Sequence, residues 1–124
     1  MNIVYVMLGG GAGAVFRYLT LFLNSSLFPF GTILVNTLGS FVLGLITSWF
    51  MRKKISKAQS LFYGTGLCGG FTTMSTFSKE VYELFHVNAR TATIYMAAST
   101  VLGIAAGVTG LKLGSLAKVK GENR

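Results

Sequence analysis

Long stretches without charge dominate the pattern of polar and apolar positions along this chain. Four windows, residues 3–23, 31–51, 58–78 and 91–111, hold a single charged residue between them, Arg17 in the first. A helix rises about 1.5 Å per residue and a bilayer core is about 30 Å thick, so each window can cross a membrane as a helix. The pattern predicts an all-α membrane protein with four transmembrane helices, at about residues 3–23, 31–51, 58–85 and 91–112.

The segments between these windows are short, which favours antiparallel neighbours in a single transmembrane domain over residues 1–124. Lys79, Glu80 and Glu83 extend the third window and are interpreted as its solvated continuation, while residues 113–124 form a basic tail. Residues 3–23 lack the basic start and cleavage site of a secretory signal, so we expect them to remain as the first span.

Composition and charge agree with a membrane protein. Of 124 residues, 52% are hydrophobic and 11% charged, and the formal net charge is +8. With four spans, the N-terminus, residues 52–57 and the tail share one side, and the basic residues gathered there are Arg52, Lys53, Lys54, Lys57, Lys112, Lys118, Lys120 and Arg124. The positive-inside rule then places both termini in the cytoplasm, and nucleic-acid binding is not needed to explain the charge.

Glycines recur at helical spacing in three of the windows. Gly9 and Gly13 form one pair, Gly66 and Gly70 another, and a stripe in the last window consists of Gly103, Gly107, Gly110 and Gly114. In membranes, small residues let helix backbones approach closely, so these positions are predicted packing faces. They exceed what one four-helix subunit can use internally, which suggests a dimer.

The third window holds the most unusual local sequence. Residues 69–78 contain two glycines and several hydroxyl residues, which disfavours a continuous helix. A broken backbone inside a bilayer survives only where protein encloses it or where it lines a cavity or an ion site. We therefore expect the third helix to be broken near its middle, beside such a site.

Two polar residues in the other windows have alternative interpretations. Arg17 is costly inside a span and either faces a partner or cavity or extends to the lipid headgroups. Asn36 lies on a polar face of the second span and either joins two helices by hydrogen bonds or donates to an anion.

Four segments together resemble the CrcB/Fluc family of fluoride channels. They are GGGAGAVFRY at residues 9–18, GTILVNTLGSFVLG at 31–44, GGFTTMSTF at 69–77 and YMAAS at 95–99. The resemblance implies a bacterial plasma-membrane protein that forms an antiparallel dimer of the dual-topology type and exports cytoplasmic fluoride passively, protecting the cell from it. The resemblance also implies that the protein is not an enzyme and needs no organic cofactor.

The resemblance also implies roles for individual residues. The fluoride pore is expected to be lined by Asn36, Met74, Phe77, Ser75, Thr76, Tyr95 and Ser99. Arg17 matches a structural arginine at the end of the first helix. Backbone carbonyls of Gly69 and Thr72 match positions that hold a structural sodium ion, Na⁺, at the dimer interface. Amide and hydroxyl donors can replace the water of fluoride without a trapping charge, and an aromatic ring presents a positive edge.

Two features depart from the family pattern. Met74 stands where the first phenylalanine of a pair is expected, and a thioether has no positive ring edge. The one-sided basic charge differs from the balance that an antiparallel homodimer needs, so the chain is either a homodimer or, as we hypothesise, half of a heterodimer with an oppositely oriented paralogue. The role of Glu80 is left open.

Other classes fit less well. Small multidrug exporters are also short four-span proteins, but they depend on a membrane-embedded glutamate, and the first span here has no acid. A purely structural membrane subunit is the second alternative. Cys68 and His86 each stand alone, so neither a cysteine metal site nor a nucleophile–base pair is indicated.

Overall fold

The computed structural model of this chain describes residues 2–20 and 29–116, and in these residues all regular structure is helical. The predicted connection between the first two spans and the basic tail fall largely outside the described residues. The helices are α1 (Asn2–Thr20), α2 (Phe30–Met51), α3 (Lys57–Ser60), η2 (Leu61–Cys68), α4 (Gly69–Phe71), α5 (Ser75–Val87) and α6 (Ala89–Leu116).

Three helices in the described residues are long and apolar enough to cross a membrane: α1, α2 and α6. They lie within or around the first, second and fourth predicted spans. This confirms, for the described residues, the all-helical class and the presence of helices that could span a membrane. The region predicted as the third span is divided among α3, η2, α4 and α5. Of these, η2 is wound as a π-helix, in which each N–H bonds five residues back.

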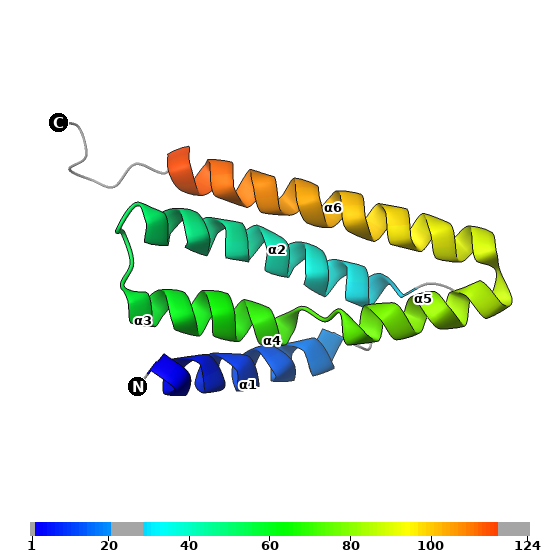
Figure 1. The fold of residues 1–124 in the computed structure, drawn as a ribbon, viewed down its shortest axis with the longest axis horizontal. Helices are drawn as coiled ribbons and strands as arrows, with labels where there is room; N and C mark the ends of the chain where they lie inside the picture. The colour runs from blue at the N-terminus through cyan, green and yellow to red at the C-terminus, as the bar shows by residue number, and fades with distance from the viewer. Residues whose placement is uncertain (1, 21–28, 117–124) are drawn as a thin grey trace.

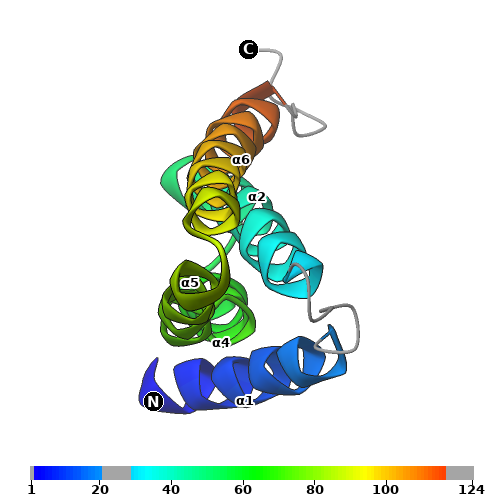
Figure 2. The same ribbon diagram turned by 90° about the vertical axis from the view of Figure 1, so that its right-hand side faces the viewer.

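The helices are arranged in successive layers, with α6 against α2, α2 against the α3–α5 path, and α1 on the far side of η2 and α4 (Figure 1). In the view turned by 90°, α1 crosses beneath α4 and α5 (Figure 2). The start of α1, the connection after α2 and the end of α6 all lie at one end of the molecule (Figure 1). At that end, the Arg52 guanidinium donates to the carbonyl oxygen of Ser115 and so ties the basic connection to α6.

Local sequence explains where several helices begin. Ser56 and Gln59 form a capping box at the start of α3. The N–H of Gln59 donates to Oγ of Ser56 at 3.1 Å, and the N–H of Ser56 donates to Oε1 of Gln59 at 2.9 Å. Asn88 is the only residue between α5 and α6, and its Oδ1 accepts from the N–H of Arg90 at 3.0 Å. Asparagine is among the best residues for such a cap, so α6 starts there.

Glycines make the helix contacts, as the sequence predicted. A Cβ added at Gly9 or Gly13 of α1 would collide with main-chain atoms of η2 and α4, and one at Gly110 of α6 with the main chain of α2. These helices therefore touch backbone to backbone, which is the close approach that small residues permit in membranes.

The interior of a single chain is small. Val35 and Tyr95 are the largest side chains in the described residues that are almost completely buried. Many large apolar side chains face outward instead, including Ile3, Met7, Leu8, Val15, Val101 and Ile104. Exposed apolar surface on this scale is typical of a lipid-facing or subunit-facing surface.

Candidate functional site

The helical path is interrupted beside the N-terminal half of α2. Helix α4 ends at Phe71, Thr72 is extended with φ −80° and ψ 158°, and α5 begins at Ser75. Thr72 stays attached to the preceding turn, because its N–H and its Oγ1 both donate to the carbonyl oxygen of Cys68, at 2.9 and 2.8 Å. We call residues 72–74 the break.

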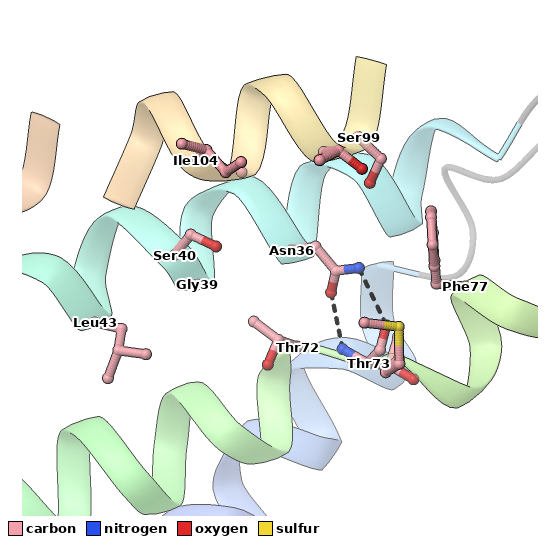
Figure 3. Close-up of a pocket in the computed structure, with 12 residues that line it drawn as sticks. Asn36, Gly39, Ser40, Leu43, Thr72, Thr73, Phe77, Ser99 and Ile104 are labelled. Atoms are coloured by element: carbon pink, nitrogen blue, oxygen red, sulfur yellow. Dashed lines mark hydrogen bonds between the residues drawn. The ribbon is translucent and has the colours of Figure 1, made fainter. Parts of the chain in front are cut away.

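Asn36 of α2 points directly at the break (Figure 3). Its Oδ1 accepts from the N–H of Thr73 at 2.8 Å, and its Nδ2 donates to the carbonyl oxygen of Thr73 at 3.1 Å. The side-chain amide of Asn36 thus takes the place of the helical hydrogen-bond partners of the N–H and the carbonyl of Thr73, which is buried. Since an asparagine amide carries two N–H donors, the bond to Thr73 uses only one of them.

Thr73 also starts the next helix. Its Oγ1 accepts from the N–H of Thr76 at 3.1 Å and lies 3.3 Å from Oγ of Ser75. A hydroxyl that accepts from an N–H three residues ahead is the usual cap of a helix N-terminus. Thr73 was not among the site residues predicted from sequence, and only the hydroxyl-rich composition of residues 69–78 pointed towards it.

These side-chain bonds change the partners of two carbonyl groups. In a continuous α-helix, the N–H of Thr73 would donate to the Gly69 carbonyl, and the N–H of Thr76 to the Thr72 carbonyl. Here Asn36 takes the first N–H and Thr73 Oγ1 takes the second. Gly69 and Thr72 are the two residues whose carbonyls are expected to hold sodium, so the local geometry fits a cation-binding role for them.

A pocket of about 460 Å³ opens beside the break, between α2, α5 and α6 (Figure 3). It is lined by Asn36, Gly39, Ser40, Leu43, Thr72, Thr73, Met74, Phe77, Ser99, Thr100, Gly103 and Ile104. The lining residues are uncharged, and amide and hydroxyl groups provide their polar atoms. Such a pocket can offer hydrogen-bond donors to a small anion without holding it by a fixed opposite charge.

Five of the residues predicted from sequence as site residues come together in this pocket, namely Asn36, Thr72, Met74, Phe77 and Ser99. The side chain of Met74 is 73% exposed, whereas that of Phe77 is partly buried. Gly39 and Ser40, which share the polar face of α2 with Asn36, also line it. Thr100, Gly103 and Ile104 of α6 were missed, because their sequence gives no sign that they face the break.

The other predicted site residues lie outside the pocket lining. Ser75 and Thr76 lie in the first turn of α5. Gly69 lies in α4, and a Cβ added to it would meet no other atom within 4 Å. Arg17 is in the last turn of α1, where its carbonyl accepts from Oγ1 of Thr20 at 2.7 Å. Tyr95 is completely buried behind Phe77, with ring centroids 5.2 Å apart.

Glu80 joins three helices next to the pocket. Its Oε1 accepts from the hydroxyl of Thr32 in α2 at 2.8 Å, and its Oε2 accepts from the hydroxyl of Tyr95 in α6 at 2.6 Å. The interpretation of Glu80 as part of a solvated continuation was therefore wrong, because Thr32 and Tyr95 are buried. That interpretation holds for Lys79 and Glu83, which form an exposed ion pair at 3.8 Å.

The fold and the site together define a multi-pass membrane protein with an uncharged, mostly apolar pocket at a helix break, into which a few amide and hydroxyl groups are placed. The chain belongs to the CrcB family: residues 4–111 match the family described as CrcB-like protein, Camphor Resistance (CrcB). The match covers most of the chain and includes α2, the break and most of α6.

Individual relatives are similar over most of their length. A protein of Bacillus subtilis (strain 168) named Fluoride-specific ion channel FluC 2 is 44% identical over 110 residues, which are 88% of this chain and 84% of that protein. One of Agrobacterium fabrum, named Fluoride-specific ion channel FluC, is 42% identical over 120 residues, 92% and 96% of the two chains. Another of that name, from Shewanella sediminis, is 47% identical over 92 residues, 71% and 74% of the two chains.

Proposed function

We propose that this chain is a subunit of a fluoride-selective channel, not an enzyme, through which cytoplasmic fluoride leaves the cell passively. The observation that carries the proposal is the uncharged pocket at the break, where Asn36, hydroxyl groups and the ring of Phe77 converge. Amide and hydroxyl donors replace the water around a small, strongly hydrated anion, and a ring edge adds a positive field. The names of the relatives at 42–47% identity support fluoride as the anion.

Passive transport is sufficient for protection against fluoride. In acidic surroundings fluoride enters cells as the neutral acid and is trapped as the anion at the higher pH of the cytoplasm. An open, selective pathway then lets the anion leave down its own gradient without an energy source. A pocket without a fixed positive charge suits this task, because the ion can leave as readily as it enters.

The proposed subunit crosses a bacterial plasma membrane four times, and α3 to α5 form a third crossing that is interrupted at the break. The α3–α5 path running alongside α2 supports this arrangement (Figure 1). Both termini lie in the cytoplasm in this proposal. The basic residues near the shared end of the helices, among them Arg52, Lys53 and Lys54, support that orientation.

Two subunits assemble in antiparallel orientation, with Na⁺ between them on the carbonyls of Gly69 and Thr72. The apolar side chains exposed on a single chain and the open space at Gly69 support a partner subunit. The strong one-sided charge supports a heterodimer with an oppositely oriented paralogue over a homodimer.

Fluoride efflux from proteoliposomes that contain this chain, together with its partner subunit if one is required, tests the channel; it is followed with a fluoride electrode and compared with chloride. Phe77→Ile removes the ring from the pocket and is expected to lower fluoride efflux at least about tenfold, which corresponds to roughly 1.4 kcal/mol in the barrier. Phe85→Ile is the matched control on the same helix, because Phe85 is 48% exposed and does not line the pocket. Equal chloride flux would refute selectivity, and unchanged efflux in Phe77→Ile would favour a structural subunit.

The same assay tests the partner. Proteoliposomes that contain only this chain are expected to show little fluoride efflux, and addition of an oppositely oriented paralogue is expected to produce it. Robust efflux from the chain alone would contradict the heterodimer and leave the homodimer.

A further inference from the structure

At the break, side-chain oxygens accept hydrogen bonds from main-chain N–H groups that would bond to carbonyls in a continuous helix. We propose that Asn36 and Thr73 are positioning residues for a monovalent cation: by taking the N–H groups of Thr73 and Thr76, they keep the carbonyl oxygens of Gly69 and Thr72 available as ligands. The inference rests on the sodium site of the proposed function. It adds the two residues that shape this site, both of which also line the anion pocket.

Asn36 controls the Gly69 carbonyl. Gly69 has helical angles, with φ −62° and ψ −39°, so its carbonyl points along the helix axis towards the break. The N–H that would meet it there belongs to Thr73 and is 2.8 Å from Oδ1 of Asn36. The second bond, from Nδ2 to the Thr73 carbonyl, fixes the orientation of the amide, so Oδ1 cannot turn away without losing both bonds.

Thr73 controls the Thr72 carbonyl. With ψ at 158° in place of about −42° in a helix, Thr72 turns its carbonyl out of the helical direction. The two bonds from Thr72 to the Cys68 carbonyl anchor its amide and side chain in that position. The N–H of Thr76 would favour a return to helical bonding, but Oγ1 of Thr73 accepts it instead at 3.1 Å.

The two carbonyls suit a monovalent cation. They lie at the C-terminal end of the α3–η2–α4 path, where the aligned peptide dipoles leave partial negative charge. Backbone carbonyl oxygens replace the hydration shell of K⁺ in channel filters, and carbonyls at unwound helices coordinate Na⁺ in transporters. Since Asn36 both binds the main chain of Thr73 and lines the pocket, one side chain links the proposed cation site to the anion pocket.

Sodium-dependent thermal stability of the purified full-length chain in detergent, with its partner subunit if one is required, tests the inference. NaCl is titrated against choline chloride at constant ionic strength, and the melting temperature is fitted for the sodium concentration at half-effect. Asn36→Ala and Thr73→Val are each expected to raise that concentration at least about tenfold, equivalent to roughly 1.4 kcal/mol of binding free energy. Thr73→Ser keeps the hydroxyl and is expected to restore the wild-type value.

Thr109→Val is the matched control for Thr73→Val. Its hydroxyl donates only within its own helix, to the Ala105 carbonyl at 2.7 Å, so its loss is expected to leave the sodium dependence unchanged. A wild-type half-effect concentration in both Asn36→Ala and Thr73→Val would overturn the inference. If Asn36→Ala does not fold, the Thr73→Val and Thr73→Ser pair decides it.

Failure of the underlying site gives a different result. If the wild-type protein shows no stabilisation by sodium over choline, the sodium site itself is absent, and the positioning roles fall with it. Fluoride-electrode efflux of the wild-type protein, reconstituted into liposomes, reports separately on the channel. Retained efflux in a protein that sodium does not stabilise would overturn the sodium site and leave the channel proposal intact.

Discussion

Asn36 and Thr73 form a closed pair of hydrogen bonds, in which one side-chain amide serves both main-chain groups of one residue, at 2.8 and 3.1 Å. The two residues are 37 positions apart and belong to different helical paths. Their pairing therefore fixes how α2 lies against the break and brings a polar side chain to the pocket at the same point.

Amide hydrogen exchange reports directly on this pair. In Asn36→Ala the N–H of Thr73 loses its acceptor while it stays buried, and leaving a buried donor unpaired costs about 1–3 kcal/mol. Exchange at Thr73 is then expected to become at least roughly fivefold faster, measured by NMR or mass spectrometry in detergent. The amides in the middle of α6 serve as the internal control, and unchanged exchange at Thr73 would show that Asn36 does not hold it.

Glu80 is expected to stabilise the junction of α2, α5 and α6. Glu80→Ala removes the acceptor of two buried hydroxyls, those of Thr32 and Tyr95, which predicts a loss of about 1–3 kcal/mol in the free energy of unfolding. Glu83→Ala, one turn later and in an exposed ion pair, is the matched control and is expected to change it by less than about 0.5 kcal/mol. Denaturant titration in micelles measures both, and equal effects would contradict the role of Glu80.

Met74→Phe tests the departure from the family pattern. Met74 lines the pocket and is 73% exposed, so a larger ring fits without repacking the chain. A ring edge at this position is expected to increase fluoride efflux, because it offers the anion a positive edge that the thioether lacks. Met51→Phe, 74% exposed at the end of α2 and outside the pocket, is the control. Equal efflux in the two variants would show that position 74 does not meet the ion.

Glycine replacements in α1 are expected to separate by position. A Cβ at Gly13 would meet main-chain atoms of Leu67 and Phe71, whereas a Cβ at Gly11 meets nothing within 4 Å. Gly13→Ala is therefore expected to lower the free energy of unfolding by about 1–3 kcal/mol through overpacking. Gly11→Ala is expected to be neutral or stabilising, since alanine is the better helix former by about 1 kcal/mol. Similar melting temperatures for the two variants would contradict the backbone contact.

Much of the helical fold follows from the sequence, because window length and charge decide it. Helices α2 and α6 coincide closely with the second and fourth windows, and α1 with the described part of the first. The glycine spacing correctly predicted which helix faces touch. The π-helical winding of η2 was not foreseen, since nothing in its composition distinguishes it from an apolar α-helix.

The site was only partly predictable, because it depends on the register between distant helices. The polar types of Asn36 and Ser99 indicated donors, and both line the pocket. Tyr95 was also expected to line the pocket, but its hydroxyl donates a hydrogen bond to Glu80 instead. This contact depends on how α5 packs against α6. The pore roles of these residues and the orientation of the subunits stay predictions.

The backbone-to-backbone packing of α1 limits how this protein can change. When a side chain is enlarged in an ordinary core, a second substitution that shrinks its neighbour can restore the fit. The atoms opposite Gly9 and Gly13 belong to peptide groups, and no amino-acid substitution can make a peptide group smaller. Damage at these positions therefore has no compensating partner side chain across the contact, and a screen for suppressors of Gly13→Ala should recover reversion to glycine before any replacement at a contacting position.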